Sequence, residues 1–134
     1  MADATVTGLR QINLIIVPTA RQDEAIAFYV DKLGFEKRTD DAFGDKYRWV
    51  EVYPAEGTAG IALAPPPEGS PAPGGMQTGI VIATDDIEAS HAALRDAGAD
   101  VDAEVSRMGG PVPPMFWLRD TERNVLMVVE ASGS

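Results

Sequence analysis

The chain has 134 residues, of which 45% are hydrophobic and 24% are charged, and it contains no cysteine. This length suits a single globular domain, and the missing cysteines exclude disulfides, thiolate metal sites and cysteine nucleophiles, as in a cytoplasmic protein. The formal net charge of −10 disfavours nucleic acid as a partner. Neither a membrane span nor a signal peptide is expected.

The first half of the chain combines predicted strands with one helix. Residues 11–18 form a short apolar, β-branched run that predicts a buried strand. The Thr-Ala-Arg-Gln sequence at 19–22 matches a capping box, so a helix is expected from there to Gly34. Three strands are predicted next, at 35–40, 47–54 and 60–66, with turn-prone segments between them.

The second half repeats this order after a connection at 65–75 that holds five prolines and three glycines. A strand is predicted at 78–85, a helix at 87–98, and further strands at 99–105, 113–120 and 124–130. Shifting the chain on itself by 64 residues pairs Ile16 with Ile80 and Gly34 with Gly98. We therefore expect one domain over 1–134, with βαβββ units at about 10–64 and 77–131.

Four segments resemble the vicinal oxygen chelate superfamily, which includes glyoxalases, extradiol dioxygenases and bleomycin resistance proteins. They are residues 25–36, 47–52, 84–101 and 116–130, and the resemblance extends from about residue 10 to 131. It implies an α+β fold in which the two units form a curved mixed sheet around a cup, with helices outside. The turn at 120–124 departs from the family pattern by lacking its proline and glycine, so Asn124 is expected to replace in part the usual residue with positive φ.

In the enzymes of this superfamily, His, Glu or Gln side chains on the first and last strands of each unit hold a divalent metal. The resemblance assigns those positions to Asn13–Ile15, Leu63, Gly79 and Met127. These residues offer almost none of the nitrogen and oxygen donors that such metals require, so neither metal nor cofactor is expected. The single histidine, His91, falls on the apolar stripe of the second helix and is interpreted as a packing residue.

Strand alternation predicts which side chains line the cup instead. Val50 and Val52 suit the face packed against the helices, which turns the residues between them towards the cup. The 64-residue offset pairs Tyr53 with Trp117 and Glu51 with Met115, and strand 124–130 adds the face that carries Met127. The predicted ligand-binding residues are Trp49, Glu51, Tyr53, Met115, Trp117 and Met127, all flat, sulfur-containing or acidic.

Each of these assignments has an alternative. The aromatic side chains are also compatible with a core or a dimer interface. Glu51 is compatible with a solvated rim position, with a counter-charge for a ligand, or with a general base. Arg119, at a strand end, is expected to form an ion pair with Asp120 or with another neighbour.

Three functions follow from this pattern. The first is a metal-free protein of the glyoxalase/bleomycin resistance type, which holds a planar or cationic organic ligand in an aromatic cup. The second is a glyoxalase-like lyase, isomerase or dioxygenase, and the third a regulatory or structural subunit with a vestigial cup. The sequence leaves open whether a reaction is catalysed. A homodimer is expected because half-closed sheets leave free edges and an apolar face.

Overall fold

Short runs of apolar and β-branched residues begin each half of the chain and form its first strand. The computed structural model describes residues 8–45, 47–57 and 59–131. The first half contains β1 (Leu14–Pro18), α1 (Gln22–Ala27), the π-helical turn η1 (Phe28–Lys32), β2 (Glu36–Phe43), β3 (Tyr47–Tyr53) and β4 (Gly60–Ala64). The second half contains β5 (Gln77–Thr84), α2 (Ile87–Asp96), β6 (Asp100–Val101), β7 (Met115–Arg119) and β8 (Val125–Glu130).

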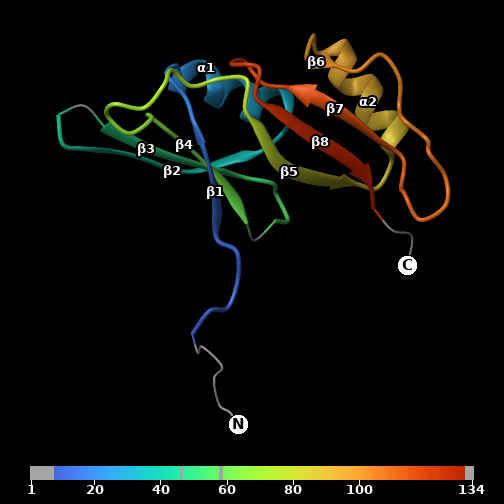
Figure 1. The fold of residues 1–134 in the computed structure, drawn as a ribbon, viewed down its shortest axis with the longest axis horizontal. Coiled ribbons are helices and arrows are strands. Elements are labelled where there is room, and N and C mark those ends of the chain that lie inside the picture. The colour runs from blue at the N-terminus through green and yellow to red at the C-terminus, as the bar shows by residue number, and fades with distance from the viewer. Residues whose placement is uncertain (1–7, 46, 58, 132–134) are drawn as a thin grey trace.

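The strands form two four-stranded mixed sheets, in the orders β1-β4-β3-β2 and β5-β8-β7-β6. In each sheet the first strand is parallel to the last, and the other neighbours are antiparallel. The sheets lie beside each other with β1 and β5 near the middle of the molecule, and each half contributes its own helix (Figure 1). The predicted α+β fold with two βαβββ units is therefore confirmed, and its sheets are curved but not closed.

Alternate residues of the inner strands build the hydrophobic core. Val50 and Val52 of β3, and Phe116 and Leu118 of β7, have 0% exposure. They belong to one cluster of buried side chains that includes residues from both halves. Because successive side chains of a strand point to opposite faces, the residues between them lie on the open faces of the two sheets.

The start of α1 differs from the predicted capping box. The Thr19 hydroxyl accepts a hydrogen bond from the Arg21 amide (3.1 Å), and no side chain caps the helix. The side-chain amide of Gln22 instead donates to the backbone carbonyls of Arg48 (2.6 Å) and Leu63 (2.9 Å). The side chain of Gln22 therefore links the start of the helix to the first sheet and does not complete a capping box.

Element ends agree with the sequence in part. Gly34 closes the helical segment of the first half with a φ of 78°, as predicted. The strand expected at 99–105 is confined to Asp100–Val101, whereas β2 continues to Phe43, beyond its predicted end. None of the helices in the described ranges is long and apolar enough to cross a membrane.

The turn between β7 and β8 joins the two halves. The buried carboxylate of Asp120 accepts hydrogen bonds from the Tyr29 hydroxyl (2.9 Å), the Asn124 side chain (3.0 Å) and the backbone amides of Glu122 and Asn124. The hydroxyl of Thr19 donates to the Glu122 carboxylate. Burial, reinforced by the negative charge of Asp120, raises the pKa of the Tyr29 hydroxyl far above its usual value. We call these contacts the inter-half junction.

The positive φ that the family's glycine would supply in this turn falls on Arg123, at 67°, so the prediction for Asn124 is wrong. Asn124 is only 1% exposed, and its side chain bonds to Asp120 and to the Met76 amide (3.0 Å). A left-handed conformation costs an ordinary residue about 1–2 kcal/mol. The hydrogen bonds that Asp120 makes to this turn offset that cost.

Candidate functional site

Three side chains of β3 lie on the open face of the first sheet and are hydrogen-bonded to one another. The indole Nε1–H of Trp49 donates to Oε2 of Glu51 (2.7 Å), and the hydroxyl of Tyr53 donates to Oε1 (2.8 Å). All three side chains are half-buried. The bond to Glu51, together with burial, raises the pKa of the Tyr53 hydroxyl. Alternation predicted that these three residues share one face of the strand. In the structure, the carboxylate of Glu51 is held there between two neutral donors, Trp49 and Tyr53.

The ring of Tyr53 is fixed by two neighbours that the sequence did not point to. A Cβ atom on Gly60 would lie 2.7 Å from the ring, so the ring packs directly against this glycine of β4. The guanidinium carbon of Arg38 lies over the ring, 4.6 Å from its centroid. Tyr53 therefore supports Glu51 rather than offering a free stacking surface. A glycine at the start of an apolar strand is the available signal, because it often marks a close approach of another group.

Trp117 and Met127 lie opposite each other on β7 and β8, on the open face of the second sheet. The Trp117 side chain is 37% exposed although both of its neighbours in the strand are fully buried. A hollow of about 90 Å³ lies beside it, lined also by Gly79 and Val81 of β5. An indole and a thioether thus border a small depression that is open to solvent.

The other predicted residues of β7 are more enclosed. Met115 is 9% exposed and lies opposite Val129. The guanidinium of Arg119 donates to Asp100 and to Asp102 at 2.9 Å each, so its ion pairs are with the β6 region and not with Asp120. Arg119 is therefore engaged in joining β6 to β7.

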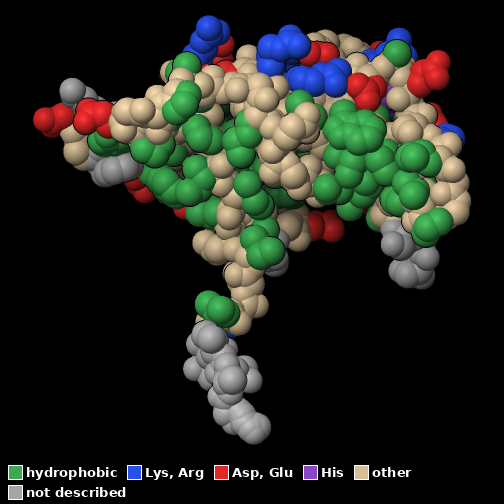
Figure 2. Space-filling view, viewed as in Figure 1, with side chains coloured by type: hydrophobic (Ala, Val, Ile, Leu, Met, Phe, Trp, Pro, Cys, Tyr) green, Lys and Arg blue, Asp and Glu red, His purple; other side chains and the backbone are tan. Residues whose placement is uncertain are grey.

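The six predicted binding residues form two groups, one on each sheet. Within the described ranges, no hydrogen bond or ring contact joins the groups. Apolar side chains are exposed on the first strand of each sheet, with Ile16 at 53% and Val81 at 51%. Figure 2 shows hydrophobic side chains in a broad band across both halves, while charged side chains gather along one edge and at one end. Hydrophobic side chains thus occupy much of the face seen in this view, and most charged side chains lie along one edge of it.

The positions that the resemblance assigns to metal ligands do not fit a metal. Leu63 has 0% exposure and lies opposite Val50 in the core, so it faces the helices, contrary to expectation. Gly79 and Met127 carry no nitrogen or oxygen side-chain donor, and Asn13 is exposed just before β1. Among the residues that the structure describes, no three His, Cys, Asp or Glu side chains are grouped to hold a metal ion.

His91 is a packing residue of α2, as predicted. It is 7% exposed, its ring lies 4.9 Å from that of Phe116 in an edge-on arrangement, and Nε2 bonds to the carbonyl of Asp102 (2.7 Å). The imidazole thus ties α2 to the loop after β6.

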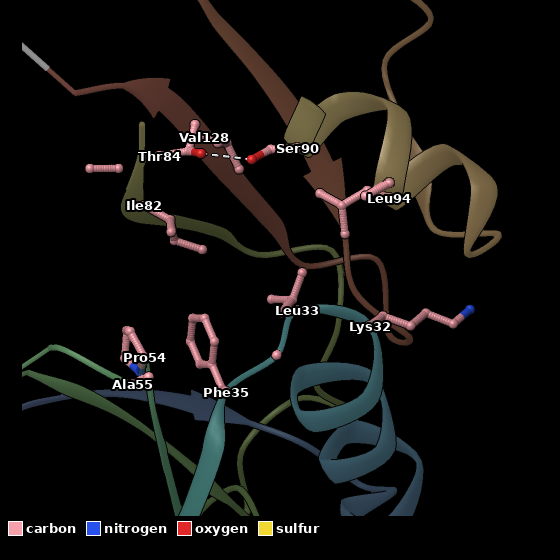
Figure 3. A pocket seen from close by; sticks show the side chains of 13 residues that line it. Lys32, Leu33, Phe35, Pro54, Ala55, Ile82, Thr84, Ser90, Leu94 and Val128 are labelled. Carbon is pink, nitrogen blue, oxygen red and sulfur yellow. Dashed lines mark hydrogen bonds between the residues drawn. The ribbon is translucent and has the colours of Figure 1, made fainter. Parts of the chain in front are cut away.

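A groove of about 330 Å³ lies between the two halves and was not predicted. In Figure 3, Leu33 and Phe35 form one wall, and Ile82, Leu94 and Val128 lie across from them. Lys32 points away from it, and the hydroxyls of a threonine and a serine at one end bond to each other (2.7 Å). Its walls come from segments far apart in the chain, so strand alternation offers no signal for it.

Comparisons with known proteins agree with this architecture. The family model described as Glyoxalase/Bleomycin resistance protein/Dioxygenase superfamily matches residues 11–128. YurT of Bacillus subtilis (strain 168), an uncharacterized protein, is 29% identical over an alignment of 117 residues that covers 81% of this chain and 90% of YurT.

Two solved structures are similar over nearly the whole chain. A member of the same superfamily from Sphaerobacter thermophilus DSM 20745 has a TM-score of 0.83 at 29% identity, covering 92% of this chain and 98% of that one. TnmS3, an antibiotic binding protein from Streptomyces sp. CB03234, has a TM-score of 0.80 at 27% identity, covering 95% and 100%.

Proposed function

Because the chain belongs to the glyoxalase/bleomycin resistance protein/dioxygenase superfamily, we propose that it is a metal-free protein that binds a small planar or cationic organic molecule. The molecule lies against the open faces of the two sheets. The proposed binding residues, three from each sheet, are Trp49, Glu51, Tyr53, Met115, Trp117 and Met127.

The observation that carries this proposal is the exposure of Trp117. Phe116 and Leu118 beside it are fully buried, whereas Trp117, which lies opposite Met127, is 37% exposed. An exposed indole beside a thioether offers stacking and adaptable dispersion contacts to a flat molecule. The likeness to TnmS3, an antibiotic binding protein, supports a ligand of this class. The metal-free character is supported by the lack of donors at Gly79 and Met127.

A thermal-shift screen with planar aromatic antibiotics and small metabolites tests the proposal. We expect an organic ligand to raise the melting temperature, because at a hundredfold excess over Kd a ligand stabilises the native state by about 2.7 kcal/mol. Trp117→Ala is expected to weaken binding about 5- to 150-fold, since stacking of a flat ring on an aromatic side chain is worth about 1–3 kcal/mol. Trp117→Phe, which keeps a flat ring, is the matched control and should retain most of the shift. Stabilisation by divalent metals alone would contradict the proposal.

We also propose that the protein is a homodimer whose contact covers part of the apolar surface. Ile16 and Val81 are more than half exposed on β1 and β5, the edge strands of the two sheets, and large exposed apolar patches usually mark an interface. Light scattering at micromolar concentration should give about twice the chain mass of 14.2 kDa. Val81→Lys should shift the mass towards the monomer, and a monomeric wild-type chain would refute the dimer.

A further inference from the structure

We infer that Glu51 is the anchor for a positively charged group of the ligand, so that the site selects organic cations over neutral and anionic molecules of the same shape. This inference rests on the proposed function and narrows its ligand class. It follows from the bonds of the carboxylate, from the engagement of the cations nearby, and from the way that Tyr53 is held.

Both oxygens of Glu51 are occupied by donors that carry no charge. Trp49 donates to one oxygen at 2.7 Å and Tyr53 to the other at 2.8 Å, which fixes the carboxylate on the open face of β3. A carboxylate has about four acceptor sites, so acceptor positions remain for a ligand. The two hydrogen bonds fix the position of the carboxylate, but because both donors are neutral they do not balance its negative charge.

The cations near this part of the first sheet are already engaged elsewhere. Arg38 donates to Glu36 (3.0 Å) and to the backbone carbonyl of Ala55 (3.3 Å). Arg48 forms a two-pronged contact with Asp40, at 2.7 and 2.8 Å. Across residues 8–45, 47–57 and 59–131, no ion pair is made by Glu51.

On the open face, Glu51 has a polar neighbour on one side, Thr39 of β2, and apolar neighbours on the other side, towards β4 and β1. Ala62 of β4 lies opposite Glu51, and Ile16 of β1, which is exposed, lies opposite Ala62. A half-buried carboxylate without a counter-charge is costly, and a ligand that brings a cation removes part of that cost. A neutral ligand gains nothing from the charge, and an anion is repelled by it.

Tyr53 is the positioning residue for this anchor. Its ring is held between the backbone of Gly60 and the guanidinium of Arg38, so its hydroxyl is aimed at Glu51. Removing the hydroxyl alone, in Tyr53→Phe, keeps the ring packing and releases one oxygen of the carboxylate. We expect the ratio of the affinities for a cationic and a neutral aromatic molecule to fall a few-fold in this variant.

The test uses three probes that share a naphthylmethyl group and differ in its terminal substituent, which is an ammonium, a methyl or a carboxylate group: naphthylmethylammonium, ethylnaphthalene and the anion of naphthaleneacetic acid. Isothermal titration calorimetry on the full chain should show that the cation binds at least about tenfold more tightly than the neutral probe, with the anion weakest. Glu51→Gln keeps the shape of the side chain and should reduce this preference to about threefold or less. Glu104→Gln removes one negative charge from an exposed site and should leave the preference intact, which separates the anchor from the overall charge.

The outcomes distinguish this inference from the proposed function. If the cation and the neutral probe bind equally well to the wild-type chain, the anchor is refuted while binding of planar molecules stands. If the preference survives in Glu51→Gln, or disappears equally in Glu104→Gln, the anchor is again refuted. If none of the probes binds at millimolar concentration, both the anchor and the proposed function are overturned.

Discussion

Replacing Asp120 by alanine is expected to lower the free energy of unfolding by about 3–5 kcal/mol. The carboxylate accepts four hydrogen bonds at the inter-half junction, one of them from the Tyr29 hydroxyl. Tyr29 has 0% exposure and Asn124 has 1%, so the donors left behind cannot turn to water. Each buried donor without a partner costs about 1–3 kcal/mol, against a total stability of about 5–15 kcal/mol.

Urea unfolding measures this effect, and two variants calibrate it. Tyr29→Phe removes one donor and leaves Asp120 bonded to the turn, so a loss of about 1–2 kcal/mol is expected. Asp41→Ala removes an exposed carboxylate of β2 and should change stability by less than about 0.5 kcal/mol. A loss below about 1 kcal/mol for Asp120→Ala would show that the junction does not hold the halves together.

The second large effect is expected for Leu63→Ala, at about 2–5 kcal/mol of lost stability. Leu63 has 0% exposure and lies between Val17 of β1 and Val50 of β3, both of them also fully buried. Truncating the side chain removes apolar contacts and leaves a cavity that close-packed neighbours fill only in part.

Met127→Ala is the matched control, because the 64-residue offset treats Leu63 and Met127 as equivalent. Met127 is only half-buried, on the open face opposite Trp117, so its loss should cost about 1 kcal/mol or less. Equal losses of stability for the two variants, measured by urea unfolding, would contradict the assignment of Leu63 to the core and Met127 to the open face.

Local periodicity was sufficient to predict the faces of the strands. In β3 the valines Val50 and Val52 are buried, and the residues Trp49, Glu51 and Tyr53 share the open face, because alternation depends only on neighbours in the chain. Alternation does not predict how side chains of neighbouring strands pack against each other. The contact of Tyr53 with Gly60, which makes this tyrosine a support, depends on how β3 and β4 are placed.

The internal repeat predicted the order of elements but not the equivalence of side chains. Leu63 faces the core and Met127 the open face, although the offset pairs them. A shift of one residue turns every side chain of a strand to the other side. β5 contains such an irregularity, a register shift between Gln77 and Val81 with Gly79 at a φ of 73°. After this bulge the pairing again follows the offset, since Val81 lies opposite Met127 as Val17 lies opposite Leu63. The offset therefore preserves the pairing of these strands but not the face that a side chain occupies, because Val17 is fully buried and Val81 is 51% exposed.

The contacts between the two halves could not be predicted from the sequence, for a different reason. The Tyr29 hydroxyl and Asp120 are 91 residues apart. The walls of the groove in Figure 3 come from the end of η1 and the turn after it, the loop after β3, and from β5, α2 and β8. No local pattern encodes a pairing over such a separation. Only the departure of the turn at 120–124 from the family pattern marked this region, and the residue that adopts the positive φ there was still misassigned.

The bulge in β5 also bears on the tendency of the chain to aggregate. β5 forms an edge of its sheet, and its Thr-Gly-Ile-Val-Ile-Ala-Thr sequence is uncharged and rich in β-branched residues, the composition of segments that stack into fibrils. An irregular hydrogen-bonding ladder is a poor template for an added strand. We therefore expect the irregular stretch around Gly79, which has open space beside it, to make this edge a poor site for aggregation.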